Sequence, residues 1–294
     1  MRKIKPLTNV IFSVIGILIS LLTVLPLLFA VIISFSSEAS IARKGYSFIP
    51  LEWSADSYRY LLASIDSVGR AFIVSVAVTV LGTALSLWLI GTMAFTLSRA
   101  DFPLRGLCTV LIMIPMFFGG GLVASYVVNT QLFGLKNSFF ALILPQACSS
   151  WYIIVMRTYF RDNIPNELID AARIDGAGIS RIFFEIVIPL GRPIFTAVGI
   201  FEAFAYWNSW YYAMLYIRPE RKELYPLQYL LYSIQKNAEF MATNDNITGA
   251  VLKTIPTESF RMAVVVIITL PILLAYPLVR RHIITGMLTG AVKE

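Results

Sequence analysis

Charged residues are scarce in this chain of 294 residues. Asp, Glu, Lys and Arg make up 14% of it, whereas 57% of its residues are hydrophobic. A typical soluble domain is about 25% charged. One compact core could not bury this much apolar side chain, and a disordered chain would contain far less of it. The composition excludes an ordinary soluble or disordered protein and predicts a protein that lies in lipid.

Cysteine and histidine are nearly absent. The chain has two cysteines, Cys108 and Cys148, which lie in apolar stretches, and one histidine, His282. We expect both cysteines to be small buried hydrophobic residues, which argues against a disulfide framework and against a metal site. A single histidine gives little support to histidine-rich metal chemistry or to a Ser-His-Asp triad.

Motifs of nucleotide-binding and hydrolytic enzymes are also missing. The chain has no G-x-x-x-x-G-K-[ST], no H-E-x-x-H and no G-x-S-x-G. Gly176 and Gly178 begin a G-x-G-x-x-G pattern, but Arg181 replaces its last glycine and no strand precedes it. We therefore predict a protein that is not an enzyme and that binds no cofactor or metal itself. Any use of ATP must depend on another subunit.

Long apolar stretches are what the sequence does contain. Each is near the length of about 20 residues that crosses a bilayer. They cover residues 10–35, 69–97, 107–129, 139–160, 190–214 and 260–279. The first stretch is too long for the apolar part of a signal peptide, so we interpret it as a retained transmembrane helix. Three adjacent glycines, Gly119 to Gly121, predict either a bend or close helix packing.

No internal repeat or domain linker is visible. We predict one all-α membrane domain of six transmembrane helices over residues 1–294, with external loops at 36–68 and 215–258 and a cytoplasmic loop at 161–189. Cytoplasmic N- and C-termini are favoured, because the inside segments then carry a net charge of +6 against +2 outside. Basic flanks that face cytoplasm and anionic lipid explain the overall charge of +7, so we expect no nucleic-acid partner.

The cytoplasmic loop carries an unusual pattern. Pro165 can occupy a first helical turn, and Glu167 is favourable near the positive end of a helix dipole. Gly176 and Gly178 are typical helix stops. One apolar face at helical spacing is formed by Ile164, Leu168, Ala171 and Ala172. The pattern predicts a short helix that packs in a protein groove rather than on lipid, since small alanines flanked by charges are poor lipid anchors.

A second apolar stripe follows the glycines. It consists of Ile179, Ile182, Phe183 and Ile186, and Pro189 then ends the run before the next span. The whole loop is therefore predicted to be a short helix, a glycine turn and a second amphipathic helix that leads into the membrane.

These residues carry a family resemblance. Asp170-Ala171-Ala172, Gly176 and Ile186-Val187-Ile188-Pro189 resemble the EAA loop (E-A-A-x3-G-x9-I-x-L-P) of binding-protein-dependent ABC importer permeases. Asp170 replaces the family's Glu, and Ile188 replaces its Leu. The stretches 118–128, 134–145, 206–217 and 225–231 resemble carbohydrate importer permeases, in particular the second permease subunit of the maltose-type and complex-oligosaccharide importers.

The resemblance implies a type I permease fold in the bacterial cytoplasmic (inner) membrane. It implies a second homologous permease subunit, two cytoplasmic ATPase subunits that hold ATP and Mg, an extracytoplasmic sugar-binding protein and surrounding lipid. The imported carbohydrate is expected to be an oligosaccharide, and acidic ones like alginate are among the candidates. The loop would couple to the ATPase through Glu167, Asp170, Ala171, Ala172, Arg173, Asp175, Gly176, Ile186 and Pro189.

Two further groups are candidate sites. Glu202 is the only acidic residue within a predicted span, and it faces either the pathway and a neighbouring helix or the cytoplasmic water. Beside it, aromatic faces and an amide that suit a sugar occur at Tyr206, Trp207, Asn208 and Trp210, although an interfacial aromatic belt explains most of them. The resemblance implies contact with the binding protein in the second external loop, where Asn237, Asn244, Asp245 and Asn246 lie.

The alternative function is a secondary transporter or channel that works without an ATPase. Such folds often show inverted repeats and paired charges inside the membrane. Neither feature is visible in this sequence.

Overall fold

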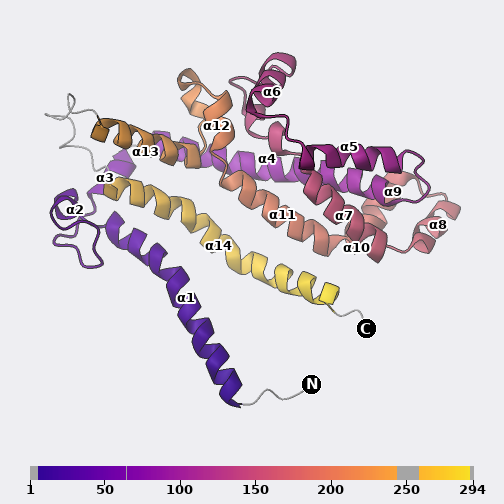
Figure 1. Cartoon of the computed structure of the whole chain (residues 1–294), viewed down its shortest axis with the longest axis horizontal. Coiled ribbons are helices and arrows are strands. Elements are labelled where there is room, and N and C mark those ends of the chain that lie inside the picture. The colour runs from indigo at the N-terminus through magenta and orange to yellow at the C-terminus, as the bar shows by residue number, and fades with distance from the viewer. Residues whose placement is uncertain (1–5, 64, 244–257, 292–294) are drawn as a thin grey trace. The chain divides into compact units, whose positions relative to one another are not determined.

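The computed structural model describes residues 6–63, 65–243 and 258–291, with side chains for 8, 10–63, 65–236 and 258–274. That part of the chain is helical and contains no strand, apart from an isolated antiparallel bridge between Ser36 and Trp53 (Figure 1). The α-helices are α1 (Pro6–Ser34), α2 (Glu38–Lys44), α3 (Asp56–Ala63), α4 (Ile65–Ser98), α5 (Arg105–Phe117), α6 (Leu122–Val127), α7 (Ser150–Asn163), α8 (Asn166–Ile174), α9 (Ile179–Ile182), α10 (Ile188–Leu190), α11 (Arg192–Trp207), α12 (Tyr211–Tyr216), α13 (Leu227–Thr243) and α14 (Glu258–Ala291). Short 3₁₀ or π segments are η1 (Val128–Leu132), η2 (Phe139–Leu142), η3 (Leu144–Gln146), η4 (Phe183–Val187) and η5 (Pro219–Leu224).

Several of these helices are long and apolar enough to cross a membrane. Among the described residues, two segments meet that criterion as single helices, namely Val10–Ser34 and Ile65–Ser98. Up to five crossings result if the bent helix pairs Arg105–Phe117 with Leu122–Leu132, Phe139–Gln146 with Ser150–Asn163, and Ile179–Leu190 with Arg192–Trp207 each count as one. The predicted all-α class is confirmed, whereas the number of spans stays a prediction.

The long loops between the spans contain helices of their own. Residues 36–68 include α2 and α3, and residues 215–258 include η5 and α13. The sequence reading treated the second loop only as a polar connection. The 17 residues of α13 show that much of it is helical.

A bend at the three glycines replaces a straight third span. The helix axis bends by 116° between α5 and the α6–η1 segment. At this bend Gly121 has a φ of 79°, a left-handed conformation that favours glycine. A Cβ atom added at Gly119, Gly120 or Gly121 would find no atom within 4 Å. Of the two explanations open from the sequence, the structure therefore supports the bend and not close packing within this chain.

The chain divides into two compact units. One comprises residues 1–68 and 231–273, and the other comprises residues 69–230 and 274–294. In the first unit, most of α1 exposes its apolar side chains, and none of its best 18-residue window is buried. Glu38 at the start of α2 accepts hydrogen bonds of 2.8 Å from the backbone N–H and the hydroxyl of Ser259. This carboxylate caps the N-terminus of α14, where the helix dipole favours negative charge.

The second unit has two apolar clusters. The first joins α4, α7, α8, α9, η4 and α11 through buried residues such as Ile90, Met156 and Ile182. The other joins α4, η2, α11 and α12 through buried residues such as Leu142 and Tyr216. Because α4 and α11 contribute to both clusters, these two helices connect the bent segments of this unit.

Tyr206 fastens α11 against α4. Its side chain is 1% exposed, and its hydroxyl lies 3.0 Å from the Ser86 hydroxyl and donates to the Ile143 carbonyl at 3.1 Å. A Cβ atom added at Gly82 would come within 2.5 Å of the Tyr206 ring. Since both bonds hold the hydroxyl in place, the ring cannot move aside. Glycine at position 82 is therefore a packing requirement.

Replacing Gly82 with Ala should lower the melting temperature of the purified membrane complex. Overpacking of this kind costs about 1–3 kcal/mol. Gly69→Ala on the same helix is the matched control, because its added Cβ meets nothing within 4 Å and helix propensity favours Ala. Equal melting temperatures for the two variants would contradict the packing assignment.

Candidate functional site

The short helix α8 occupies the centre of the predicted loop. Its nine residues carry Glu167 in the first turn and Arg173 in the last turn, where each charge is favourable to the helix dipole. Pro165 has a ψ of 137° and stands one residue before the helix, not in its first turn as the sequence suggested. The extended backbone of Ile164, which a following proline favours, explains the later start.

α8 presents two different faces. Ile169 is 2% exposed and packs in the first cluster, with Ala172 half-buried beside it. The opposite face exposes Leu168, Ala171 and Ile174, and Ile174 is 87% exposed. The single apolar face expected from the sequence is thus wrong. Ile164 lies before the helix and does not belong to its face, and Ile169 rather than Leu168 packs into the core.

A glycine turn ends α8 as predicted. Gly176 has a φ of 81°, its N–H bonds the Arg173 carbonyl at 3.0 Å, and the Ala177 N–H bonds the Ala172 carbonyl at 2.9 Å. This pair of bonds is the Schellman motif, which needs a left-handed residue at the position of Gly176. The exposed Asp170 and Asp175 lie on either side of the last turn of α8.

The second amphipathic segment is not a regular helix. α9 passes into the π segment η4, and α10 continues through the exposed Pro189 as far as Leu190. The chain then turns by 83° between Leu190 and Arg192. Pro189 therefore does not break the run, because a proline is tolerated in the first turn of α10. Ile186 packs at the edge of the first cluster.

Two residues in the turn after α4 contact α8. Arg99 is 6% exposed and donates from Nη1 to the Asn166 Oδ1 at 3.1 Å. Asp101 lies 2.7 Å from Nη2 of Arg173, and this hydrogen bond lowers the pKa of the Asp101 carboxyl below its usual value. Sequence reasoning missed both residues, since nothing local links position 99 or 101 to the loop.

The residues proposed from sequence for the substrate pathway separate into buried and exposed ones. Glu202 is 3% exposed, Tyr206 1% and Trp207 8%. Glu202 lies beside Ser86, so it neighbours α4 rather than open water within this chain. Asn208 and Trp210 are exposed. The Asn208 Oδ1 accepts a hydrogen bond of 3.2 Å from Gln228 Nε2, a partner that the sequence reading overlooked.

The residues predicted to contact a binding protein lie outside this description. The structure describes the backbone of Asn237, in α13, but not its side chain, and Asn244, Asp245 and Asn246 fall in the gap after residue 243.

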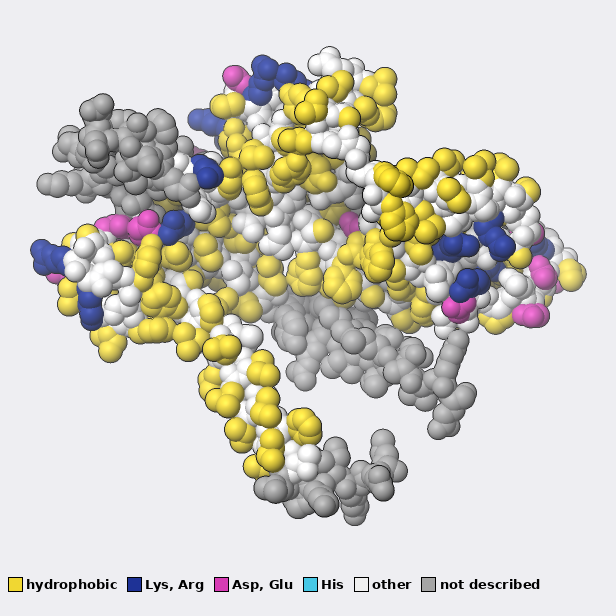
Figure 2. All heavy atoms as spheres, in the orientation of Figure 1, with side chains coloured by type: hydrophobic (Ala, Val, Ile, Leu, Met, Phe, Trp, Pro, Cys, Tyr) yellow, Lys and Arg dark blue, Asp and Glu magenta, His cyan; other side chains and the backbone are white. Residues whose placement is uncertain are grey.

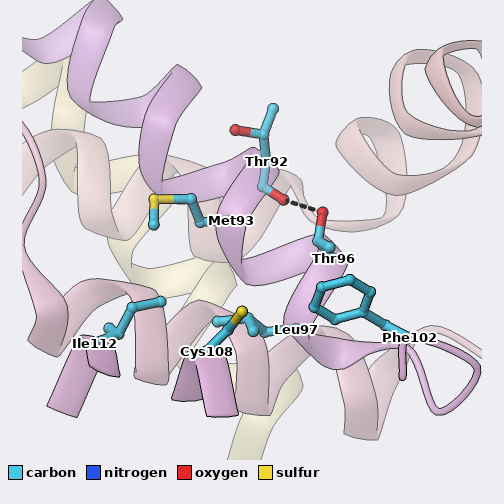
Figure 3. Close-up of a pocket in the computed structure, with 7 residues that line it drawn as sticks. All are labelled: Thr92, Met93, Thr96, Leu97, Phe102, Cys108 and Ile112. Carbon is cyan, nitrogen blue, oxygen red and sulfur yellow. Dashed lines mark hydrogen bonds between the residues drawn. The ribbon is translucent and has the colours of Figure 1, made fainter. Parts of the chain in front are cut away.

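A pocket of about 240 Å³ lies between α4 and α5 (Figure 3). Its lining is Thr92, Met93, Thr96, Leu97, Phe102, Cys108 and Ile112. The hydroxyls of Thr92 and Thr96 both donate to carbonyls of their own helix, which leaves the pocket without a free donor. It is therefore poorly suited to a sugar. Cys108 is half-buried as expected, whereas Cys148 is exposed, contrary to expectation.

On the face shown in Figure 2, basic side chains gather near α12 and near α7 and α10, and others lie over α2. Near α12, the Asn137 Oδ1 accepts from the backbone N–H of Arg218 at 2.7 Å, which brings Lys136 close to Arg218. Arg221 and Lys222 follow in η5, where Arg221 pairs with Glu223. Positive charge from Lys136, Arg218 and Lys222 is therefore concentrated in this region.

Comparison with known proteins gives consistent matches. Residues 82–289 match the model of the family described as binding-protein-dependent transport system inner membrane component. The polygalacturonan/rhamnogalacturonan transport system permease protein YtcP of Bacillus subtilis is 36% identical over 277 residues, covering 94% of this chain and 95% of that protein. Protein LplC of the same organism is 35% identical over 288 residues, covering 96% of this chain and 95% of that protein.

One solved structure is similar over nearly the whole chain. It is a bacterial ABC transporter involved in the import of the acidic polysaccharide alginate. The two chains share 26% sequence identity with a TM-score of 0.79, and the match covers 94% of this chain and 96% of the other.

Replacing Gly176 with Ala should loosen the end of α8. The left-handed conformation costs an alanine about 1–2 kcal/mol, so amide hydrogen exchange in residues 170–178 should accelerate roughly five- to thirtyfold. Gly178→Ala is the control, because Gly178 has a φ of −71° and open space around it. Similar exchange in both variants would show that the turn does not depend on glycine.

Proposed function

Since this chain belongs to the family of binding-protein-dependent transport system inner membrane components, we propose that it is the permease subunit through which an ABC importer moves a carbohydrate. The observation that carries the proposal is the family match over residues 82–289 together with α8, which displays the EAA-like residues on a short exposed helix. A transport permease subunit is not itself an enzyme. A secondary transporter would have no use for such a helix.

The substrate we propose is an acidic oligosaccharide. The relative YtcP is described as a polygalacturonan/rhamnogalacturonan permease, and the similar structure belongs to an alginate importer. Uronates carry negative charge, which the basic residues near α12 would attract. Lys136, Arg218, Arg221 and Lys222 are the residues concerned. A neutral sugar would gain nothing from this charge.

The arrangement we propose is a six-span permease in the bacterial inner membrane, with both termini in the cytoplasm. A second, homologous permease would complete the pathway, two ATPase subunits would hold ATP and Mg below it, and a sugar-binding protein would deliver the substrate from outside. The charge difference of +6 against +2 supports this orientation. The exposed apolar surface of α1 and of the bent α5–α6 segment supports burial in lipid or against another subunit.

The coupling contact we propose centres on the exposed face of α8. Leu168, Ala171 and Ile174 would enter the groove of the ATPase, and the charges of Glu167, Asp170 and Asp175 would surround it. Ala172 and Ile186 would contribute by supporting this face from the core side, since they pack against the first cluster. Apolar anchors with a polar rim are the usual anatomy of a protein interface.

Substitution of the exposed apolar face should detach the ATPase. Ala171→Glu combined with Ile174→Glu should leave membrane insertion intact, because both side chains are exposed, yet weaken ATPase binding at least about thirtyfold, as a lost hot spot does. The measurement is the amount of ATPase that copurifies with the affinity-tagged chain. Leu62→Glu, at a side chain 66% exposed on α3, is the control. Full recovery of the ATPase with the double variant would refute the docking face.

The pathway contact we propose is the amide pair Asn208 and Gln228, with Trp210 as an aromatic neighbour. Asn208 and Trp210 are exposed and Gln228 is half-buried in this chain, and amides can donate to and accept from sugar hydroxyls. Glu202, Tyr206 and Trp207 would hold these contact residues in place from the core side, because all three are buried. Contact between Asn237, Asn244, Asp245 or Asn246 and the binding protein stays part of the proposal.

Uptake by the reconstituted complex tests the substrate class. Proteoliposomes that contain the permease pair, ATPases and binding protein should import trigalacturonate or an alginate trisaccharide when ATP is present, and should not import maltotriose. Asn208→Ala with Gln228→Ala should reduce uptake about tenfold or more, because each lost hydrogen bond costs roughly 0.5–1.5 kcal/mol. Import of maltotriose alone would overturn the acidic assignment, and import without ATP would overturn the ABC assignment.

A further inference from the structure

The connections of α8 to the rest of the chain are weak points. At one end, Ile164 and Pro165 are extended, and at the other end the turn through Gly176 and Gly178 leads to α9. Neither connection is helical, so α8 could swing about both of them if nothing else held it. A helix that rotates freely about its connections would transmit little of a partner's movement to the rest of the chain.

Two side-chain contacts prevent such a swing. Arg99 binds Asn166, the first residue of α8, and Asp101 binds Arg173, in its last turn. Asn166 and Arg173 are seven residues apart, which is two helical turns or about 10 Å along the axis. Ile169 is buried between them on the same face. Two fixed points and an apolar contact define the direction of a short helix.

Arg99 also binds the neighbouring elements. Its Nε donates to the Ser98 hydroxyl at 3.0 Å, its Nη2 donates to the Phe160 carbonyl at 3.4 Å, and its guanidinium lies 5.5 Å from the centre of the Phe95 ring. Ser98 ends α4, and Phe160 lies in the last turn of α7, where carbonyl dipoles favour a cation. One buried guanidinium thus joins α4, α7 and α8.

We propose that the turn Arg99–Asp101 is a clamp that fixes α8 to α4, so that movement of α8 by the ATPase reaches α4 directly. The inference rests on the proposed function of α8 as the ATPase contact. Arg99, Asp101 and Arg173 are positioning residues in it, since none of them needs to touch the substrate or ATP. Arg173, which the EAA resemblance places at the ATPase, pairs within the chain with Asp101 at 2.7 Å and with Asp170 at 3.8 Å.

The clamp makes coupling, rather than assembly, sensitive to these side chains. Without it, the ATPase would still bind the exposed face of α8 and hydrolyse ATP. The resulting movement would rotate α8 about its connections and would not reach α4. A residue with a merely structural role would lower the amount of complex and all its activities together.

The test uses the complete complex, purified with its ATPase and binding-protein partners. The variants are Arg99→Gln, Asp101→Asn, Arg173→Gln and the double variant of the last two. Amide exchange in residues 166–174 needs no sugar, and trigalacturonate uptake per ATP hydrolysed measures coupling. Asp56→Asn with Arg59→Gln is the control, because Asp56 and Arg59 also form an exposed ion pair, at 3.2 Å, but lie on α3.

We expect faster exchange in α8 and less uptake per ATP, with ATPase binding retained. Loss of the half-exposed Asp101–Arg173 pair should change exchange roughly two- to fivefold, and loss of the buried Arg99 about tenfold or more. The double variant should be no worse than Arg173→Gln, because that single variant already lacks both the contact with Asp101 and the 3.8 Å pair with Asp170. Arg99→Lys should restore little, since an ammonium cannot make three planar contacts.

The outcomes separate this inference from the proposed function. Unchanged exchange in α8 for Arg99→Gln and Asp101→Asn, or an equal effect of the control pair, would overturn the clamp while the ABC assignment stands. Additive effects of Asp101→Asn and Arg173→Gln would also overturn it. Failure of the unaltered chain to hold any ATPase would overturn the proposed function itself, and exchange in α8 would still decide whether the clamp exists.

Discussion

The direction of α8 depends on contacts made outside it. A helix of nine residues is too short to be stable by itself in water, because the cost of nucleation outweighs the few bonds that follow. Burial of Ile169 and the guanidinium of Arg99 supply the missing constraint. Every property proposed for the loop, from the exposure of Ile174 to the transmission of movement, presupposes that this constraint holds.

The helix pairs around this site are bent rather than straight, and a glycine lies at two of the three bends. Gly121 supplies a left-handed residue between α5 and α6, and Gly191 stands where α10 and α11 diverge by 83°. Bending brings short segments against the long helix α4, which Tyr206 fastens through Ser86. In lipid such breaks are tolerated only where neighbouring segments satisfy the backbone groups that a break exposes.

Much of the fold class and of the loop could be predicted from sequence, because both depend on local pattern. Apolar runs indicated helices, and Gly176 indicated the turn that its φ of 81° requires. The contacts of Arg99, Asp101 and Gln228 could not be predicted, because their partners lie 20 or more positions away in the sequence. No local sequence pattern links residues at that separation. The face of α8 was misjudged because Ile164 was counted as part of the helix, whereas it lies in the extended connection before it.

The exposed apolar surface of α1 has a consequence for membrane insertion. None of the best apolar window of this helix is buried by the other described residues. In lipid, α1 can therefore be inserted as an independent unit, because no other segment of this chain is needed to cover its side chains. The basic residues Arg2, Lys3 and Lys5, which precede it in the sequence, would then favour the cytoplasmic side for that end of the helix. The apolar side chains of α1 are thus available to lipid or to another subunit rather than to the packing of this chain.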